Sequence, residues 1–309
     1  MQIVVDAQAR EVAIRFVLCL VLCFLFLALA PINARADLSA KQARSLIQKT
    51  AGMSLPSSSV RVQKPVMVNP NVAEASAELD LVFRFVTDTL GGWRIAEVRT
   101  GQGRWEEIEL ITRSVGGKLS STECNSTGGF PKPARDLTSK RARCLVAELF
   151  GIALPSDDVR IKSVSGFSIP LSTEPSATAV TKVRLAVRFA KDQSGWHTTA
   201  FKSGSRDWIG IDSATASVDA AKSSQARNDM YAIAAALESF RRDRGGFVVS
   251  DNHLALIDHL SPRYLPRIIR LDPWHNPYAY QGERDRFRLR SAGPDGQQNT
   301  GDDVVLSVP

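Results

Sequence analysis

The spacing of apolar residues predicts a long helix in the last third of the chain, beginning at Val218. Apolar side chains recur there at intervals of three or four, and so lie on one helical face: Met230, Ile233, Leu237 and Phe240. The glycine pair at 245–246 predicts the end of this helix, because glycine readily adopts the left-handed conformation that closes a helix. Further on, Phe287 and Leu289 alternate with polar residues, which predicts a strand.

Two stretches nearer the amino terminus share one pattern of residues. The segment DLSAKQAR at 37–44 returns as DLTSKRAR at 136–143, and GMSLPS at 52–57 returns as GIALPS at 151–156. In the same order, three pairs of aromatic positions correspond further along: Phe85 with Phe189, Trp93 with Trp196, and Trp105 with Trp208. This self-similarity predicts two copies of one small domain.

Each copy is predicted to open with a helix and to continue as strands. Asp37 and Asp136 stand where a helix needs a capping residue, and Gly52 and Gly151 stand where each helix would stop. The segment 79–85 alternates apolar and polar residues, as a strand with one buried face does. The tryptophans that recur in both copies are expected in the core rather than in a ligand groove.

The first 36 residues have the layout of a signal peptide. Arg15 precedes an apolar run at 16–32, and Ala34 and Ala36 place small side chains where signal peptidase cuts. The run is short for a membrane span, which needs about 20 apolar residues. We therefore expect cleavage after Ala36 and a periplasmic or extracellular protein. An uncleaved leader that anchors the chain in the inner membrane is the alternative.

Composition and charge narrow the class of partner. A chain of 309 residues with 44% hydrophobic and 23% charged side chains is ordinary globular material. Its net charge of +7 falls to +6 without the leader, which holds three arginines against two acidic residues, and this surplus favours anionic surfaces. The basic residues are scattered and are not interleaved with aromatic ones, so no nucleic-acid groove is expected.

Cleavage of the leader leaves Cys124 and Cys144 as the thiols of the exported chain. Export into an oxidising compartment makes a disulfide between them possible. The alternative is two unrelated cysteines, since Cys144 falls on the apolar face of a predicted helix, where a buried thiol is common.

An acidic segment near the carboxyl end predicts a metal site. The sequence SAGPDGQQNTGDD at 291–303 supplies Asp295, Asp302 and Asp303 among residues that permit tight turns. Calcium takes six to eight hard oxygen ligands at loose geometry, so these carboxylates suit one Ca²⁺ ion. The spacing is not that of an EF-hand, and an acidic surface turn without metal is the alternative.

The order of motifs in this region resembles the globular domain of the major pseudopilin of type II secretion systems. The long helix, DPWHNPY at 272–278 and the aspartate-rich segment follow one another as in that family, over residues 218–305. The resemblance implies a calcium-binding loop with Asp295, Asp302 and Asp303 as side-chain ligands, and with backbone carbonyls of Ala292 and Leu306 completing the shell. The chain departs from the family where His275 replaces a glycine, and it lacks the prepilin cleavage site.

The sequence as a whole therefore predicts an α+β protein: two tandem repeats of a small helix-plus-antiparallel-sheet domain, followed by a pilin-like domain with a long helix and a small C-terminal β-sheet. The predicted boundaries are a signal peptide at 1–36, the first repeat at 37–113, a linker at 114–135, the second repeat at 136–212 and the pseudopilin-like calcium-binding domain at 218–309, after a junction that begins at Ser213 to Ser217.

No catalytic motif accompanies this organisation. The histidines are His197, His253, His259 and His275, and none has the spacing of a zinc or catalytic site; Asp272, before a proline, is read as a turn cap. The leading hypothesis is a non-enzymatic envelope protein, structural or interacting, whose protein partners belong to type II secretion or pilus-like machinery. The alternatives are an exported hydrolase or cell-wall-binding protein that uses loop carboxylates, and a membrane-tethered accessory subunit.

Overall fold

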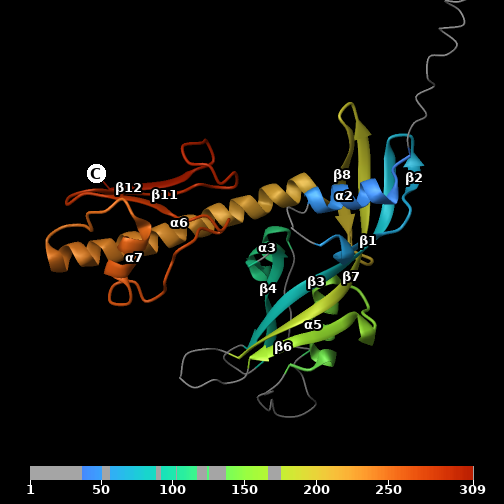
Figure 1. The fold of residues 1–309 in the computed structure, drawn as a ribbon, viewed down its shortest axis with the longest axis horizontal. Coiled ribbons are helices and arrows are strands. Elements are labelled where there is room, and N and C mark those ends of the chain that lie inside the picture. Colours follow the sequence, from blue (N-terminus) through green and yellow to red (C-terminus); the bar gives the residue numbers. More distant parts are fainter. Residues whose placement is uncertain are drawn as a thin grey trace, which may run out of the picture. The chain divides into compact units, whose positions relative to one another are not determined.

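The computed structural model describes residues 37–50, 56–87, 92–101, 103–116, 124, 137–165 and 175–308. Figure 1 shows the fold. The predicted signal peptide and most of the predicted linker lie outside these residues. The elements of the amino-terminal part are α2 (Ala40–Thr50), η1 (Ser57–Ser59), β1 (Val60–Val62), β2 (Val66–Asn69), β3 (Val72–Thr87), β4 (Trp93–Gly101), β5 (Arg104–Glu107), α3 (Ile108–Ser114), α5 (Ser139–Phe150), η2 (Ser156–Asp158), β6 (Val159–Ser165), β7 (Ser176–Asp192), β8 (Gly195–Lys202) and β9 (Ile209–Gly210).

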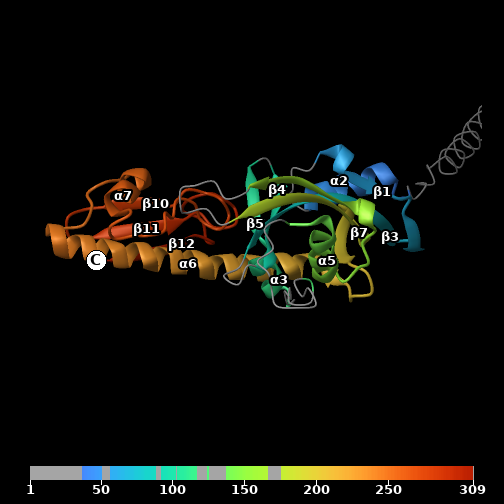
Figure 2. The same cartoon turned by 90° about the horizontal axis from the view of Figure 1, so that it is seen from below.

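These strands form one antiparallel sheet whose centre is the pair β3 and β7. The two strands pair without a break from Val72 opposite Ala190 to Val86 opposite Ser176, and Figures 1 and 2 show them side by side. Strands β1, β2 and β4 lie on the other side of β3, and β6 and β8 lie on the other side of β7. The two segments that resemble each other in sequence therefore contribute equivalent strands to a shared sheet.

The sheet has one apolar face and one charged face. Alternate residues of β3 are buried, among them Ala77, Leu81 and Phe83, as the alternating pattern predicts. The residues between them face the other way and form ion pairs across the β3–β7 boundary, such as Arg188 with Glu74 at 2.8 Å and Arg184 with Glu78 at 3.2 Å. The charged residues of this open face are thus matched between the two segments.

Helices α2 and α5 begin in equivalent ways, although the predicted caps at Asp37 and Asp136 are wrong. Ser39 Oγ accepts a hydrogen bond from the backbone N–H of Gln42, and the Gln42 side chain accepts one from the Ser39 N–H, so that a reciprocal capping box starts α2. Thr138, at the position equivalent to Ser39, accepts from the Arg141 N–H and caps α5. The hydroxyl residue suits the cap because it lies two residues closer to the first turn than the aspartate does. Gly151 ends α5 in the left-handed conformation, as predicted.

The recurring tryptophans do not all lie in the core. Trp93 is fully buried, but Trp105, Trp196 and Trp208 are only half-buried, which corrects the core prediction for these three. The guanidinium of Arg84 lies 4.2 Å from the Trp105 ring centre, and that of Arg188 lies 4.1 Å from the Trp208 ring centre. An arginine over the face of an indole covers it by a cation–π contact, so the ring is protected without full burial.

Cys124 and Cys144 are joined by a disulfide bond, with their Cα atoms 5.6 Å apart. Of the two readings of the cysteines, the bridged one is therefore confirmed. The bond links α5 to the segment that precedes it.

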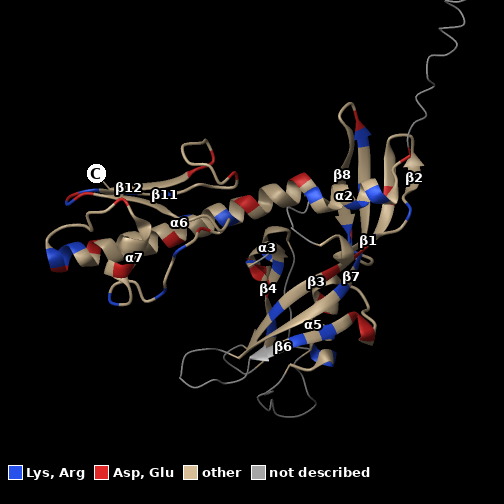
Figure 3. Cartoon of the chain, in the orientation of Figure 1, with Lys and Arg blue, Asp and Glu red and all other residues tan. Residues whose placement is uncertain are grey.

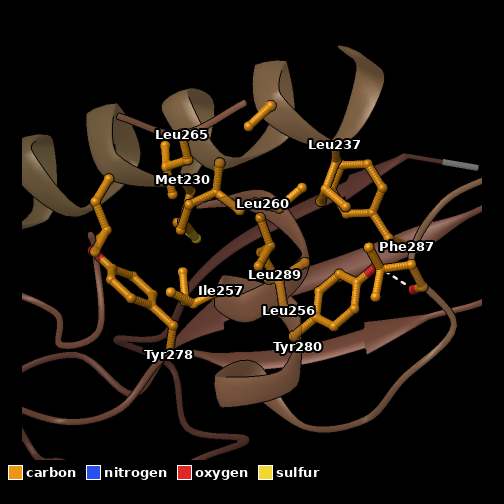
Figure 4. Close-up of a cluster of buried hydrophobic side chains, with 14 of the residues drawn as sticks. Met230, Leu237, Leu256, Ile257, Leu260, Leu265, Tyr278, Tyr280, Phe287 and Leu289 are labelled. Atoms are coloured by element: carbon orange, nitrogen blue, oxygen red, sulfur yellow. Dashed lines mark hydrogen bonds between the residues drawn. The ribbon is translucent and has the colours of Figure 1, made fainter. Parts of the chain in front are cut away.

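The carboxyl-terminal part consists of α6 (Ile211–Arg244), α7 (His253–Leu260), and the antiparallel sheet of β10 (Ala279–Gly282), β11 (Phe287–Ser291) and β12 (Val304–Val308). Helix α6 ends at Gly245 as predicted, but it starts before Val218, so the predicted junction at Ser213 to Ser217 is helical. Figure 4 shows its core, in which Met230 and Leu237 of α6 face Leu256 and Leu260 of α7 and Leu289 of β11. The predicted helical face is therefore the buried one.

The α+β class, the long helix and the small C-terminal sheet agree with the sequence-based prediction. The two predicted tandem repeats do not form two small sheets, because their strands pair with each other in one nine-stranded sheet. The boundaries predicted for the separate domains remain predictions. Within the described ranges, no helix is both long enough and apolar enough to cross a membrane.

Candidate functional site

The DPWHNPY motif forms a tight turn that is organised by one buried carboxylate. Asp272 is 3% exposed, and its Oδ1 accepts hydrogen bonds from the backbone N–H groups of Trp274 at 3.0 Å and Asn276 at 2.8 Å. Its Oδ2 accepts from the Ser291 hydroxyl at 2.5 Å. The predicted role of Asp272 as a turn cap is therefore confirmed, and the same side chain fastens the turn to the first residue of the aspartate-rich segment.

His275 keeps the turn geometry that a glycine would adopt easily. Its φ of 72° lies in the left-handed region, and its N–H donates to the Asp272 carbonyl at 2.8 Å. The imidazole Nε2 lies 3.2 Å from Glu106 Oε1 of β5, so the side chain has an acceptor outside the turn. Histidine at this position therefore adopts the left-handed backbone conformation and adds a side-chain contact with Glu106.

The aspartate-rich segment is a closed loop between β11 and β12. Ser291 pairs with Val304 at its base. Gly293 has a φ of 62°, and a Cβ there would meet the Asp302 carbonyl oxygen at 2.4 Å, so only glycine allows the two sides of the loop to approach so closely. This approach brings the two ends of the acidic segment together.

The three predicted aspartates converge on one hydroxyl group, that of Thr300. Thr300 Oγ lies 2.7 Å from Asp302 Oδ1, 3.4 Å from Asp295 Oδ1 and 3.5 Å from Asp303 Oδ1. Its hydrogen bond, together with one from the Asp295 backbone N–H, holds the pKa of Asp302 below its usual range. Loop closure therefore gathers these carboxylates around a common centre.

One cationic side chain reaches this cluster among the ion pairs of the described residues. Arg290 Nε lies 3.4 Å from Asp303 Oδ2, and the side chains of these two residues are 12% and 6% exposed. Arg290 also donates to the Asn299 side chain. Three carboxylates and one guanidinium leave the loop with two negative charges that have no counter-charge. One divalent cation would balance them.

The predicted carbonyl ligands lie at different places. Ala292 is buried at the base of the loop, next to the closing residue Ser291. Leu306 lies inside β12, opposite Leu289 and two residues beyond the closing pair. Within the part of the chain that the structure describes, no three Asp, Glu, His or Cys side chains stand in a ready-made metal-binding arrangement. The three carboxylates instead surround the Thr300 hydroxyl, and Asp303 also contacts the Arg290 guanidinium.

The sequence offered little indication of these supporting residues. Thr300 is one polar residue of a Gly-rich segment, and Arg290 is one of the polar residues that alternate with Phe287 and Leu289. The alternation of β11 does place Arg290 on the face opposite Leu289, but only the return path of the loop shows that Asp303 lies there.

A second group of charged residues lines a cavity of about 330 Å³ beside the DPWHNPY turn, with Glu106, Lys222, Asp229 and Arg267 in its wall. Glu106 and Lys222 are 8% and 6% exposed and lie 2.7 Å apart. Burial raises the pKa of Glu106, but the hydrogen bond and charge of Lys222 have the larger opposite effect. The pKa of Glu106 therefore lies below its usual range. Burial raises the pKa of Asp229 above its usual range, although Arg267 opposes the change.

The other three histidines make contacts typical of a structural role. His253 is 7% exposed and its Nε2 contacts the Ile269 carbonyl oxygen at 3.0 Å. His259 packs edge-on against Phe240. His197 lies 3.5 Å from Asp192, and both side chains are about half exposed.

The family comparison supports the reading of this region. Residues 213–307 match the family of the type II secretion system protein G. The match confirms the resemblance predicted for residues 218–305 and contains α6 from Ser213 onward, the DPWHNPY turn and the aspartate loop. Protein G, the major pseudopilin, is a structural and non-enzymatic protein of the cell envelope.

The matched range of 95 residues, 213 to 307 inclusive, is a minor part of the 309-residue chain. The nine-stranded sheet precedes it. No curated protein and no solved structure matches the chain at a significant level. The protein G-like region is thus joined to a sheet for which the comparisons give no relative.

Proposed function

We propose that this chain is an exported, non-enzymatic component of type II secretion or pilus-like machinery, in which a calcium-stabilised protein G-like domain is combined with a duplicated sheet that contacts protein partners. The match of residues 213–307 to protein G is the observation that carries the proposal. The reciprocal elements of the sheet, with equivalent caps at Ser39 and Thr138 and equivalent Arg–Trp contacts, support a duplication.

Calcium is proposed for the aspartate loop on charge and proximity. Three carboxylates lie within 3.5 Å of the Thr300 hydroxyl, and one guanidinium faces them. Hard carboxylate and carbonyl oxygens in a loop are what Ca²⁺ binds, and rotation of the aspartate side chains would let all three face one ion. Asp295, Asp302 and Asp303 are the proposed side-chain ligands. The Ala292 carbonyl lies near the base of the loop, and the role of the Leu306 carbonyl rests on the family resemblance alone.

The calcium proposal is tested on the exported chain from Asp37 onward, which retains the whole compact unit of Ser39–Pro309. Calcium is expected to raise its melting temperature, and at about a hundredfold excess over the dissociation constant the gain in stability is about 2.7 kcal/mol. Asp302→Asn and Asp295→Asn should remove the calcium-dependent rise. Asp285→Asn, which removes an exposed carboxylate from the β10–β11 hairpin, is the matched control and should retain it. The same melting temperature in calcium and in chelator would refute the metal site.

The proposed partners are tested by photocrosslinking in the native envelope. Tyr231 is 59% exposed on α6, inside the protein G-like region, and Val66 is 69% exposed on the edge strand β2 of the sheet. A photoreactive residue at Tyr231 is expected to capture a secretion or pilus component, and one at Val66 a partner of the sheet. Crosslinks confined to unrelated envelope proteins would contradict the assignment to secretion machinery.

The hydrolase alternative has one observation in its favour, the cavity that contains Glu106 and Asp229 with pKa values shifted in opposite directions. Both carboxylates are already occupied, however, because Lys222 and Arg104 contact Glu106 and Arg267 contacts Asp229 at 2.5 Å. A carboxylate held by cations is poorly placed to exchange protons with a substrate. Hydrolysis of cell-wall material that Asp229→Asn abolishes, with folding retained, would favour this alternative instead.

A further inference from the structure

Helices α2 and α5, which start the two similar segments, present basic side chains to solvent. Helix α2 contains Lys41, Arg44 and Lys49 and no acidic residue; α5 contains Lys140, Arg141 and Arg143, with Glu148 near its end. Lys41, Lys49 and Lys140 are exposed and the three arginines are half-buried. Figure 3 shows blue bands on both helices. The same kind of charge therefore recurs on equivalent elements.

Both helices cover the apolar face of the sheet. Thr50, at the end of α2, contacts the Thr198 hydroxyl at 3.2 Å, and Thr198 lies opposite the buried Phe189. Phe150, at the end of α5, packs against the buried Phe83 with ring centres 6.1 Å apart. Each helix turns its small and apolar residues inward (Ala43 and Ile47; Ala142, Leu145 and Val146). Their basic residues are thus carried on the helical side of the sheet.

The basic side chains of α2 and α5 differ from those on the open face of the sheet in whether they form ion pairs. On the open face, Arg61, Arg184 and Arg188 each lie within 3.2 Å of a carboxylate. Over the ranges that the structure describes, no ion pair involves the six basic residues of α2 and α5. Unpaired cations of one sign on a surface raise its positive potential and attract an anionic partner.

We propose that the basic faces of α2 and α5 bind the anionic phospholipid headgroups of a bilayer. Three of the six residues are exposed lysines, and a flexible ammonium group suits a fluid layer of phosphates because it requires no fixed directional partner. Under the proposed export the chain crosses a membrane, and α2 would follow the exported leader closely, since the apolar run ends at Ile32, eight positions before Ala40 begins α2. A basic segment next to a bilayer gains roughly 1 kcal/mol for each Lys or Arg near the surface. This inference rests on the proposed export and is independent of the calcium loop.

The test uses the exported chain from Asp37 and vesicles of phosphatidylcholine, with and without roughly one third phosphatidylglycerol. Binding is measured by co-sedimentation at low and high salt. The chain is expected to bind the anionic vesicles, to bind the neutral ones little, and to be released by salt. Replacement of the exposed lysines, Lys41→Gln with Lys49→Gln and Lys140→Gln, should weaken binding about a hundredfold, since each removed charge accounts for about fivefold.

The matched control removes the same charge from the other side of the sheet. Arg94, Arg99 and Arg160 are exposed strand residues, and their replacement by Gln should change binding by no more than a few fold. Equal loss in both triple variants would show a general effect of net charge and overturn the assignment to the helices. Absence of binding to anionic vesicles would overturn the proposal outright. Binding of the chain to polyglutamate, an acidic-peptide probe, that anionic vesicles do not displace would overturn it as well. The calcium-dependent melting of each variant reports separately on the proposed function.

Discussion

Asp272 accepts a hydrogen bond of 2.5 Å from the hydroxyl of Ser291, nineteen positions along the chain. The contact joins the DPWHNPY turn to the start of the aspartate loop, because the same carboxylate also binds the N–H groups of Trp274 and Asn276. The first residue of the loop is therefore held in place by the turn, independently of the contacts among the aspartates at the loop tip.

Replacement of Asp272 by alanine is expected to lower the free energy of unfolding by about 3 to 5 kcal/mol, since a buried donor left without its acceptor costs about 1 to 3 kcal/mol and this change leaves several. Urea denaturation of the chain from Asp37 onward measures it. Asp285→Ala, at an exposed position of the β10–β11 hairpin, should alter stability by less than about 0.5 kcal/mol. A loss at Asp272 as small as that of the control would mean that the turn does not depend on this carboxylate.

The sequence predicted the carboxyl-terminal part more fully than the amino-terminal part. Met230, Ile233 and Leu237 lie on the buried face that helical periodicity predicts, and Gly245 ends the helix. These features depend on local spacing. The pairing of β3 with β7 depends on a contact between residues over a hundred positions apart, such as Glu74 with Arg188, and no local pattern specifies it.

In the candidate site, too, the features set by local sequence were predicted and those set by long-range contacts were not. The Asp295, Asp302 and Asp303 cluster was visible as composition and as a family motif, and their convergence follows from loop closure. The pairing of Arg290 with Asp303 was missed, because it requires the register of β11 and β12. The cap at Ser39 was also missed, since Asp37 is an equally good capping residue by type and only the position of the first helical turn decides between them.

Loss of the disulfide is expected to destabilise the sheet region. Cys124 and Cys144 close a segment of 20 positions, and a cross-link of that length contributes about 3 kcal/mol by restricting the unfolded chain. Cys144→Ser should therefore lower the melting temperature of the chain from Asp37 onward, and a reducing agent should have the same effect on the unmodified chain. If reduction lowers the melting temperature of Cys144→Ser as well, the effect does not come from this bond.

His253 is expected to make stability depend on pH. Burial holds the pKa of its imidazole below the usual value near 6.5. The folded protein then binds fewer protons than the unfolded chain once the pH falls below about 6.5, so stability is complete above that pH and declines as the pH falls toward the folded-state pKa. The midpoint of urea unfolding, measured from pH 8 down to about pH 5, should fall more steeply for the natural chain than for His253→Gln. Parallel profiles would show that other groups cause the decline.

The buried ion pair of Glu106 and Lys222 is expected to behave as a coupled unit. Glu106→Gln leaves the Lys222 ammonium, 6% exposed, without its charged partner, and the removal of one member of a buried pair costs about 3 to 5 kcal/mol. Lys222→Met should cost less, because Arg104 and His275 remain beside the carboxylate at 3.0 and 3.2 Å. Combining the two changes removes both charges, so the double variant should be more stable than the sum of the single losses predicts. Urea denaturation of the four proteins completes the cycle, and simple additivity would show that the two side chains do not interact in solution.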